Sequence, residues 1–277
     1  MRDAIRFTAT VDGNKSEEFL GLCYSSGMVG CEELDGLKFT CYFETQEDAD
    51  ATLKLVSDIV LDVTLSEEIK DRDWNAKWRE TIEPVKVTDT IWVSPEWLEP
   101  PLEDGDYWIK IEPRMAFGTG HHETTRLCAN RVASSKGDRK SLLDIGTGSG
   151  ILAFIAEYVG YTKIVGVEID ADCKINLEEN LEANCKGAEI EFVIGTVDKL
   201  DSSLTFDTVV MNMISSISAP LLSEAKSRLN EGGNLVWSGL LVTERESSIA
   251  AAKAAGFTMI DESSEGEWWS ATYRSAK

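Results

Sequence analysis

The sequence predicts an α/β fold of two domains, a small N-terminal α+β domain and a larger C-terminal domain on a mostly parallel sheet. From residue 141 onward, strand-like and helix-like segments alternate, which is typical of a parallel sheet covered on both faces. A glycine-rich turn at residues 146–150 directly follows a buried strand. The first 66 residues show the order β-α-β-β-α-β. We therefore expect domains at residues 1–66 and 84–277, joined by a linker helix at 67–83.

The N-terminal pattern is that of a ferredoxin-like unit. Residues 4–11 alternate between apolar and polar, and a helix pattern follows at 16–25. Two strand-like runs, 28–34 and 37–44, are joined by Asp35-Gly36, a strong hairpin signal. A helix over 46–59 and a strand over 60–65 complete the unit, and this fold predicts a small binding or docking domain.

The junction, residues 66–113, holds charge clusters and five of the eight tryptophans. Trp74 and Trp78 are four residues apart, which places both on one face of a short helix. They either join the two domains or form a hinge whose aromatic face meets the catalytic domain. Short strands are expected at 85–87, 91–93 and 107–111, divided by prolines.

The glycine-rich turn is the centre of the C-terminal domain. Residues 142–145 form an apolar strand with one aspartate, and residues 146–150 (Gly-Thr-Gly-Ser-Gly) lead into a helix at 151–159. Glycines without a Cβ let a ligand approach the backbone. A second strand, 163–168, ends on Glu168, 22 positions after Gly146. Its carboxylate is placed to accept hydrogen bonds from both hydroxyls of a ribose, each of about 1.5–3 kcal/mol.

The C-terminal third continues the alternation and ends in a hairpin. A strand at 206–211 leads to Asn212, followed by a helix at 220–229 and a strand at 234–237. Two final strands, 257–261 and 268–273, flank a polar turn at 262–266. This terminal hairpin adds an antiparallel strand to the sheet, which simple doubly wound dehydrogenases usually lack.

The ligand is better matched to S-adenosylmethionine than to a dinucleotide. The dinucleotide fingerprint requires a third glycine at the helix start, where a pyrophosphate binds, and this chain has Ile151 there. S-adenosylmethionine has a ribose and an aminocarboxylate but no phosphate. A nicotinamide-dependent oxidoreductase and a non-catalytic adaptor remain alternatives.

Composition narrows the partners. The net charge of −22 argues against binding nucleic acid through many phosphate contacts, and it fits a basic polypeptide partner, although the acidity also suits solubility or a salty habitat. The six cysteines form no C-x-x-C pair, and no apolar run is long enough to span a bilayer. We expect a cytoplasmic protein without a structural metal or disulfides.

Several motifs resemble the methyltransferases that act on the L-eleven protein of the large ribosomal subunit. Residues 143–153, 166–170 and 232–233 are similar to class I S-adenosylmethionine-dependent methyltransferases in general. Residues 115–125 (Met-Ala-Phe-Gly-Thr-Gly-His-His-Glu-Thr-Thr) resemble the A-F-G-T-G-x-H-x-T-T signature of that family. The match extends through Asp73, Trp74, Trp78, the Pro95-x-Trp97 region, Asn212 and residues 237–239, so it spans about residues 70–275.

The resemblance implies a Rossmann-like, mostly parallel seven-stranded sheet, with the N-terminal unit recognising the substrate. It also implies N-methylation of lysine side chains and the N-terminal amine of that basic ribosomal protein. The implied cofactor contacts are Phe117, Thr125, Gly146, Gly148, Glu168 and Asn212. Position 168 is Glu where Asp is commoner, Glu123 replaces a frequent proline, and residues 212–214 lack the Pro-Pro-Tyr of many amine methyltransferases.

Methyl transfer needs alignment and a neutral amine more than a strong base. A lysine of pKa ~10.4 is protonated at neutral pH until desolvation lowers that pKa. The side-chain carbonyl of Asn212 is our candidate for orienting the amine. His121 and His122, the chain's two histidines, are expected to shape the 117–125 loop, with a general base or metal role as the alternatives. A different protein lysine, for example on an electron-transfer flavoprotein, remains an alternative substrate, and the sequence leaves the oligomeric state open.

Overall fold

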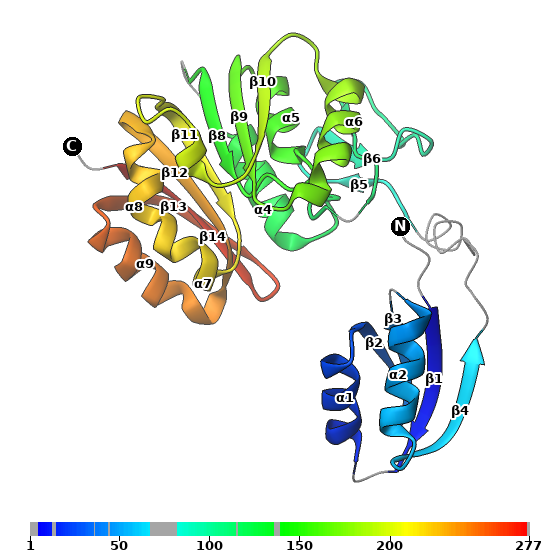
Figure 1. Cartoon of the computed structure of the whole chain (residues 1–277). Helices are drawn as coiled ribbons and strands as arrows, with labels where there is room; N and C mark the ends of the chain where they lie inside the picture. The colour runs from blue at the N-terminus through cyan, green and yellow to red at the C-terminus, as the bar shows by residue number, and fades with distance from the viewer. Residues whose placement is uncertain are drawn as a thin grey trace. The chain divides into compact units, whose positions relative to one another are not determined.

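The computed structural model describes residues 5–12, 15–35, 37–43, 45–66, 82–114, 116–135 and 139–275. The chain divides into two compact units, Met1–Ile82 and Glu83–Lys277 (Figure 1). The expected linker helix at 67–83, with Trp74 and Trp78, lies almost wholly outside the described residues. Within the described ranges, no helix is long and apolar enough to cross a membrane.

The N-terminal unit has the predicted β-α-β-β-α-β order. Its four strands form a sheet of order β2-β3-β1-β4, in which neighbouring strands are antiparallel. The elements are β1 (Ile5–Val11), α1 (Ser16–Ser25), β2 (Met28–Asp35), β3 (Lys38–Phe43), α2 (Gln46–Val56) and β4 (Val60–Ser66).

The core of this unit lies between the sheet and its two helices. Alternate residues of β1 and β3, including Phe7 and Phe43, are fully buried, and their rings stack at 5.3 Å. The predicted second helix was too long at its C-terminal end, because it stops at Val56. Ile59 has the spacing of a buried helix residue, but it is buried in the turn between α2 and β4.

The C-terminal unit is built on a seven-stranded sheet of order β10-β9-β8-β11-β12-β14-β13. The five strands β10, β9, β8, β11 and β12 are parallel to their neighbours, and β14 is antiparallel to both β12 and β13. The mostly parallel sheet and the terminal hairpin are confirmed. The strands are β8 (Ser141–Ile145), β9 (Lys163–Glu168), β10 (Glu189–Ile194), β11 (Phe206–Asn212), β12 (Leu229–Leu241), β13 (Phe257–Glu265) and β14 (Trp268–Ser275).

Helices cover both faces of this sheet (Figure 1). Consecutive strand residues belong to different core clusters, because side chains alternate between faces. Leu142 packs in the cluster of α5, whereas Leu143 packs in the cluster of α8 and α9. The helices are α4 (Glu123–Ala133), α5 (Ile151–Tyr158), α6 (Lys174–Asn184), α7 (Ser215–Ser218), α8 (Leu222–Ser227) and α9 (Arg245–Ala254).

A three-stranded sheet completes the unit, with order β5 (Val85–Lys86), β6 (Ile91–Ser94) and β7 (Tyr107–Lys110). Three buried asparagines at four-residue spacing on α6 hold the backbone that leaves β7. Asn184 exchanges two hydrogen bonds with the backbone of Lys110, and Asn180 accepts one from Glu112. Asn176 donates to the Glu112 carbonyl, and Asn180 also donates to Ser149 of the glycine-rich turn. The asparagine row therefore links the small sheet to that turn.

Two sequence predictions in this unit were wrong in detail. The helix expected at 220–229 is a 3₁₀ turn at Ala219–Leu221 followed by the short α8, and β12 already begins at Leu229. The polar turn expected at 262–266 is mostly strand. Residues 262–265 pair with β14, so the turn is confined to residues 266–267. Polar residues form strand here because β13 is the edge of the sheet and exposes most of its side chains to water.

Candidate active site

The glycine-rich turn connects β8 to α5 and is packed on two sides. Gly146, Gly148 and Gly150 have φ of 77°, 55° and 81°, a left-handed conformation that favours glycine. A Cβ on Gly148 would lie 2.4 Å from the Phe117 carbonyl oxygen. Ser149 fastens the turn to the same loop, because its backbone N–H donates to that oxygen at 2.9 Å and its hydroxyl donates to the Gly118 carbonyl at 2.7 Å.

Glu168 ends β9 beside this turn, because the carboxyl ends of parallel strands meet at one edge of a sheet. Its Oε2 accepts a hydrogen bond from the Gly148 backbone N–H at 2.9 Å, and its Oε1 accepts one from Asp170 at 3.0 Å. Two backbone donors therefore fix the carboxylate before any ligand binds. The remaining lone pairs are available to hydroxyl donors.

Asn212 ends β11 at the same edge. Its Oδ1 is buried and has no hydrogen-bond partner among the described residues. A buried acceptor without a partner is unfavourable, and because Asn212 also lines the cavity described below, this oxygen is available to a hydrogen-bond donor from a ligand.

The residues after Asn212 are held by the Trp237-Ser238-Gly239 segment of β12. Gly239 has φ of 82°, and a Cβ on it would lie 2.6 Å from the Met213 backbone. The Trp237 indole donates to Ser218 Oγ at 2.8 Å, and Ser218 donates to the Met213 carbonyl at 3.1 Å. These contacts explain why a tryptophan stands at position 237 and a glycine at position 239.

One cavity of about 920 Å³ brings these elements together. Phe117, Gly146, Gly148, Glu168 and Asn212 line it, as the sequence predicted for a common site. Thr125 does not line it. Its side chain is buried and its hydroxyl has no partner among the described residues, while the neighbouring Thr124 contributes to the wall.

The cavity is strongly one-sided in charge. Four acidic residues, Glu168, Asp170, Asp198 and Glu224, line it, and no lysine or arginine does among the described residues. Glu224 is paired with Arg228 at 2.9 Å, which leaves Glu168, Asp170 and Asp198 as the uncompensated acids of the lining. The lining thus favours a cationic ligand, such as a sulfonium or an ammonium.

Among the described residues, the cavity lining contains one thiol, that of Cys173. Burial, with the negative charges of Glu168 and Asp170, raises the pKa of this thiol to about 11. The neutral thiol is a poor nucleophile, so the lining offers no activated cysteine for covalent catalysis.

The two histidines stand in the loop before α4. His121 Nε2 lies 2.9 Å from the Glu83 carbonyl, and His122 Nδ1 caps α4 by accepting a hydrogen bond from the Thr124 backbone N–H. The His122 ring contacts Phe117 and Trp268 edge to face, and all three line the cavity. No cluster of metal-ligating side chains occurs in the part of the chain that the structure describes. These contacts fit a structural role for both histidines.

Asp144, beneath the glycine-rich turn, is fully buried. Its Oδ2 accepts a hydrogen bond from Thr147 at 2.7 Å, and its Oδ1 has no partner among the described residues. Burial above all, and then the charge of Glu168, raises the pKa of Asp144 to about 7, although the Thr147 bond opposes this shift.

We expect Asp144→Asn to stabilise the ligand-free protein at high pH. Between about pH 4 and pH 7 the folded protein keeps a proton on Asp144 that the unfolded chain releases, so stability falls as pH rises through this range. Asparagine mimics the protonated acid at every pH. The variant's advantage in unfolding free energy, measured by urea titration, should therefore grow from about pH 5 to about pH 8 and then level off. An advantage that does not change with pH would contradict the raised pKa.

The sheet order and its cavity define the class of this protein. If β8 to β14 are renumbered 1 to 7 in chain order, their order across the sheet is 3-2-1-4-5-7-6. The glycine-rich turn follows strand 1 (β8), and the acid Glu168 ends strand 2 (β9). This is the arrangement of a class I S-adenosylmethionine-dependent methyltransferase.

Comparison with known proteins gives the family. The sequence model described as ribosomal protein L11 methyltransferase (PrmA) matches residues 20–276, and the chain belongs to this family. It is 33% identical over 260 residues to a ribosomal protein L11 methyltransferase of Geobacter sulfurreducens, which covers 88% of this chain and 84% of the relative. It is 35% identical over 210 residues to that of Desulforapulum autotrophicum, covering 75% and 69%. The protein is thus an S-adenosylmethionine-dependent protein methyltransferase.

Solved structures agree on the fold. The crystal structure of a ribosomal protein L11 methylase from Lactobacillus delbrueckii subsp. bulgaricus superposes with a TM-score of 0.64 at 23% identity, covering 71% of this chain and 99% of that one. A methyltransferase from Pyrococcus furiosus gives 0.51 at 21% identity, covering 61% and 90%.

Sequence reasoning missed three parts of the site. Trp268 lies 146 positions from His122, so its approach to that ring depends on the closing of the whole sheet. Asp198 and Ile169 follow strand ends at the same edge. An inspection of every strand end, rather than of the glycine-rich motif alone, would have indicated both.

Proposed function

We propose that this enzyme transfers methyl groups to amines of ribosomal protein L11, both lysine side chains and the N-terminal amine. The observation that carries the proposal is the buried Asn212 Oδ1, an acceptor without a partner in the cavity that Glu168 also lines. Because such an acceptor matches an amine donor, we infer that the nitrogen that receives the methyl group binds in the same cavity.

The residues present fit S-adenosylmethionine. Gly146 and Gly148 form a turn whose backbone stands close to its neighbours, and Glu168 offers carboxylate oxygens to a ribose. The acidic residues Glu168, Asp170 and Asp198 suit its positive sulfonium, and the buried Thr125 hydroxyl in the first turn of α4 is a further unpaired polar group. When bound, this cofactor supplies an electrophilic methyl group.

The chain's own task is to deliver a neutral amine in line with that methyl group. A lysine loses its proton more readily when desolvation lowers its pKa from about 10.4. Asn212 Oδ1 can accept a hydrogen bond from the neutral amine and direct its lone pair. The lining holds no group that must take part covalently, so the arrangement acts by alignment.

The N-terminal unit is the candidate for substrate recognition. Both of its helices pack on one face of the sheet, where Phe7 and Cys41 are buried. The alternate positions Thr8 and Tyr42 belong to the other face.

We place the reaction in the cytoplasm, where a ribosomal protein is made.

The acceptor can be tested with methyl-labelled cofactor and the ribosomal proteins of a cell that lacks this gene. We expect label on one basic protein, the L11 protein, and a mass spectrum of the same protein from wild-type cells should show the added methyl groups. Label confined to RNA or to small molecules would refute the substrate and leave the cofactor assignment intact. Label on a different protein lysine would move the substrate but keep the chemistry.

A further inference from the structure

Three aromatic rings form one part of the cavity wall, and we call Phe117, His122 and Trp268 the aromatic wall. The ring centroids lie 5.3 Å apart for Phe117 and His122 and 5.0 Å apart for His122 and Trp268. Phe117 is 54% exposed, so packing by itself fixes it weakly. The wall joins two segments, the loop before α4 and the β13–β14 hairpin, that are far apart in the sequence.

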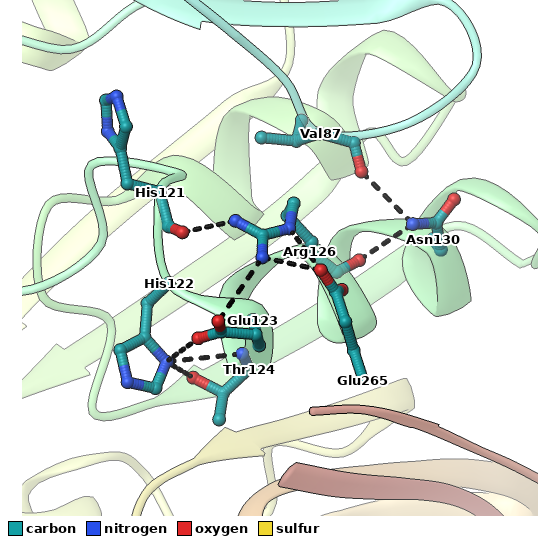
Figure 2. Close-up of polar contacts among 8 residues, drawn as sticks. All are labelled: Val87, His121, His122, Glu123, Thr124, Arg126, Asn130 and Glu265. Carbon is teal, nitrogen blue, oxygen red and sulfur yellow. Dashed lines mark hydrogen bonds and ion pairs between the residues drawn. The ribbon is translucent and has the colours of Figure 1, made fainter. Parts of the chain in front are cut away.

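One guanidinium holds both segments. Arg126, on the first turns of α4, donates from Nη1 to the His121 carbonyl and from Nε and Nη2 to Glu265 Oε1 at 2.9 and 2.5 Å (Figure 2). Glu123 lies 3.7 Å from the same Nη2. We call Arg126 and Glu265 the clasp.

Both ends of the clasp lie beside a member of the aromatic wall. His121 directly precedes His122, so a donor on its carbonyl restrains the backbone that carries the His122 ring. Glu265 is the cross-strand partner of Trp268 in the pairing of β13 and β14. Restraining Glu265 therefore restrains Trp268, and the two rings are kept in register.

Further hydrogen bonds anchor the helix that carries the clasp. The Asn130 side-chain amide, one turn after Arg126, donates to the Val87 carbonyl at 3.1 Å and to the Arg126 carbonyl at 2.9 Å (Figure 2). This fixes α4 to the small sheet. The guanidinium is thus carried by an anchored helix, and the two segments that it holds are the loop before α4 and the end of the β13–β14 hairpin.

We propose that Arg126 and Glu265 are positioning residues that set the aromatic wall along which the target amine enters. The inference rests on the proposed function. Aromatic rings offer an apolar face to the methylene stem of a lysine and attract its ammonium group. Their placement then decides how the amine approaches Asn212. The clasp contacts neither the glycine-rich turn nor Glu168, but the Phe117 carbonyl accepts a hydrogen bond from Ser149 of that turn, so loss of the clasp should weaken cofactor binding far less than it slows transfer.

The same hairpin offers a matched control. Arg245 on α9 forms a two-bond ion pair with Glu262 on β13, at 2.6 Å for each bond. The side chains of Arg245 and Glu262 are 40% and 32% exposed, whereas those of Arg126 and Glu265 are 21% and 41% exposed. Neither Arg245 nor Glu262 lines the cavity. Such partly exposed pairs contribute little to global stability. Removing either arginine should therefore have a similar small effect on folding.

The test compares Arg126→Gln, Glu265→Gln, the double variant and Arg245→Gln in the full chain. We expect each clasp variant to lower kcat on the L11 protein about 10-fold, because small displacements of a positioned group slow transfer steeply. The double variant should lose no more than the singles, since both remove one device. Calorimetry should give a Kd for S-adenosylmethionine that rises by less than the about 10-fold fall in kcat in the clasp variants, and a wild-type Kd in Arg245→Gln. Arg245→Gln should retain the wild-type kcat.

Hydrogen exchange supplies a readout that needs no acceptor. Backbone amides of residues 116–122 should exchange faster in both clasp variants than in wild type and in Arg245→Gln. Unchanged exchange there, or an equal loss of kcat in Arg245→Gln, would overturn the proposal. If the wild-type enzyme does not methylate the L11 protein, the proposed function fails, and the exchange comparison still decides whether the clasp holds the loop.

Discussion

Replacing Asn212 with alanine should lower kcat by about 100-fold to 1,000-fold, the range seen when a positioned polar group at a reacting centre is removed. The side chain supplies the buried acceptor that faces no other partner among the described residues. Without it, the amine keeps the cavity but loses the contact that directs its lone pair. The Kd of S-adenosylmethionine should change far less than kcat. Single-turnover transfer from labelled cofactor measures the chemical step, and calorimetry measures binding.

Asn234→Ala is the matched control for this experiment. Asn234 also has a buried Oδ1 without a partner among the described residues, and it lies on β12, next to β11. It pairs with Thr208 near the start of β11, whereas Asn212 ends that strand, and it does not line the cavity. Transfer at the wild-type rate in Asn212→Ala, or an equal loss in Asn234→Ala, would remove Asn212 from the mechanism.

Replacing Glu168 with alanine should weaken S-adenosylmethionine binding by at least about 100-fold. Two charge-assisted hydrogen bonds of about 1.5–3 kcal/mol each would be lost, and every 1.4 kcal/mol is a factor of ten. The same change removes the acceptor of the Gly148 N–H, so the turn itself also loosens. Titration calorimetry on the purified full chain gives the Kd directly.

Glu157→Ala separates the ribose contact from a general loss of structure. Glu157 Oε1 likewise accepts two backbone N–H groups, those of Lys186 and Ala188, both at 2.9 Å, and it does not line the cavity. We expect this variant to bind S-adenosylmethionine like wild type. Glu168→Asp, one methylene shorter, should keep most of the affinity if the carboxylate still reaches the sugar. Wild-type affinity in Glu168→Ala would refute the ribose assignment.

Local patterns predicted most elements, because each depends on neighbours in the chain. The strand before Gly146, the turn and the acid at 168 obey rules of spacing within about 25 residues, and the structure places them at one edge. The failures occurred where tertiary position overrides local pattern. Residues 262–265 are polar enough for a turn but lie on an edge strand, and Ile59 has helical spacing but ends in a connection.

The site was predicted in its motif and missed in its long-range contacts. Glu168 was singled out as the acid at the end of a strand, Asn212 was carried over from the resemblance, and both line the cavity. Thr125, inferred from the resemblance, is buried beside the cavity rather than in its wall. Trp268, and the link from Arg126 to Glu265 over 139 positions, follow from the way the hairpin closes the sheet. No local pattern contains that information.

The carboxylate-rich lining also bears on turnover. Donating the methyl group turns a positive sulfonium into a neutral thioether, while Glu168, Asp170 and Asp198 keep their places in the lining. The spent nucleoside therefore carries one positive charge fewer than the fresh cofactor, and the electrostatic part of the binding free energy in this acidic lining favours the fresh cofactor.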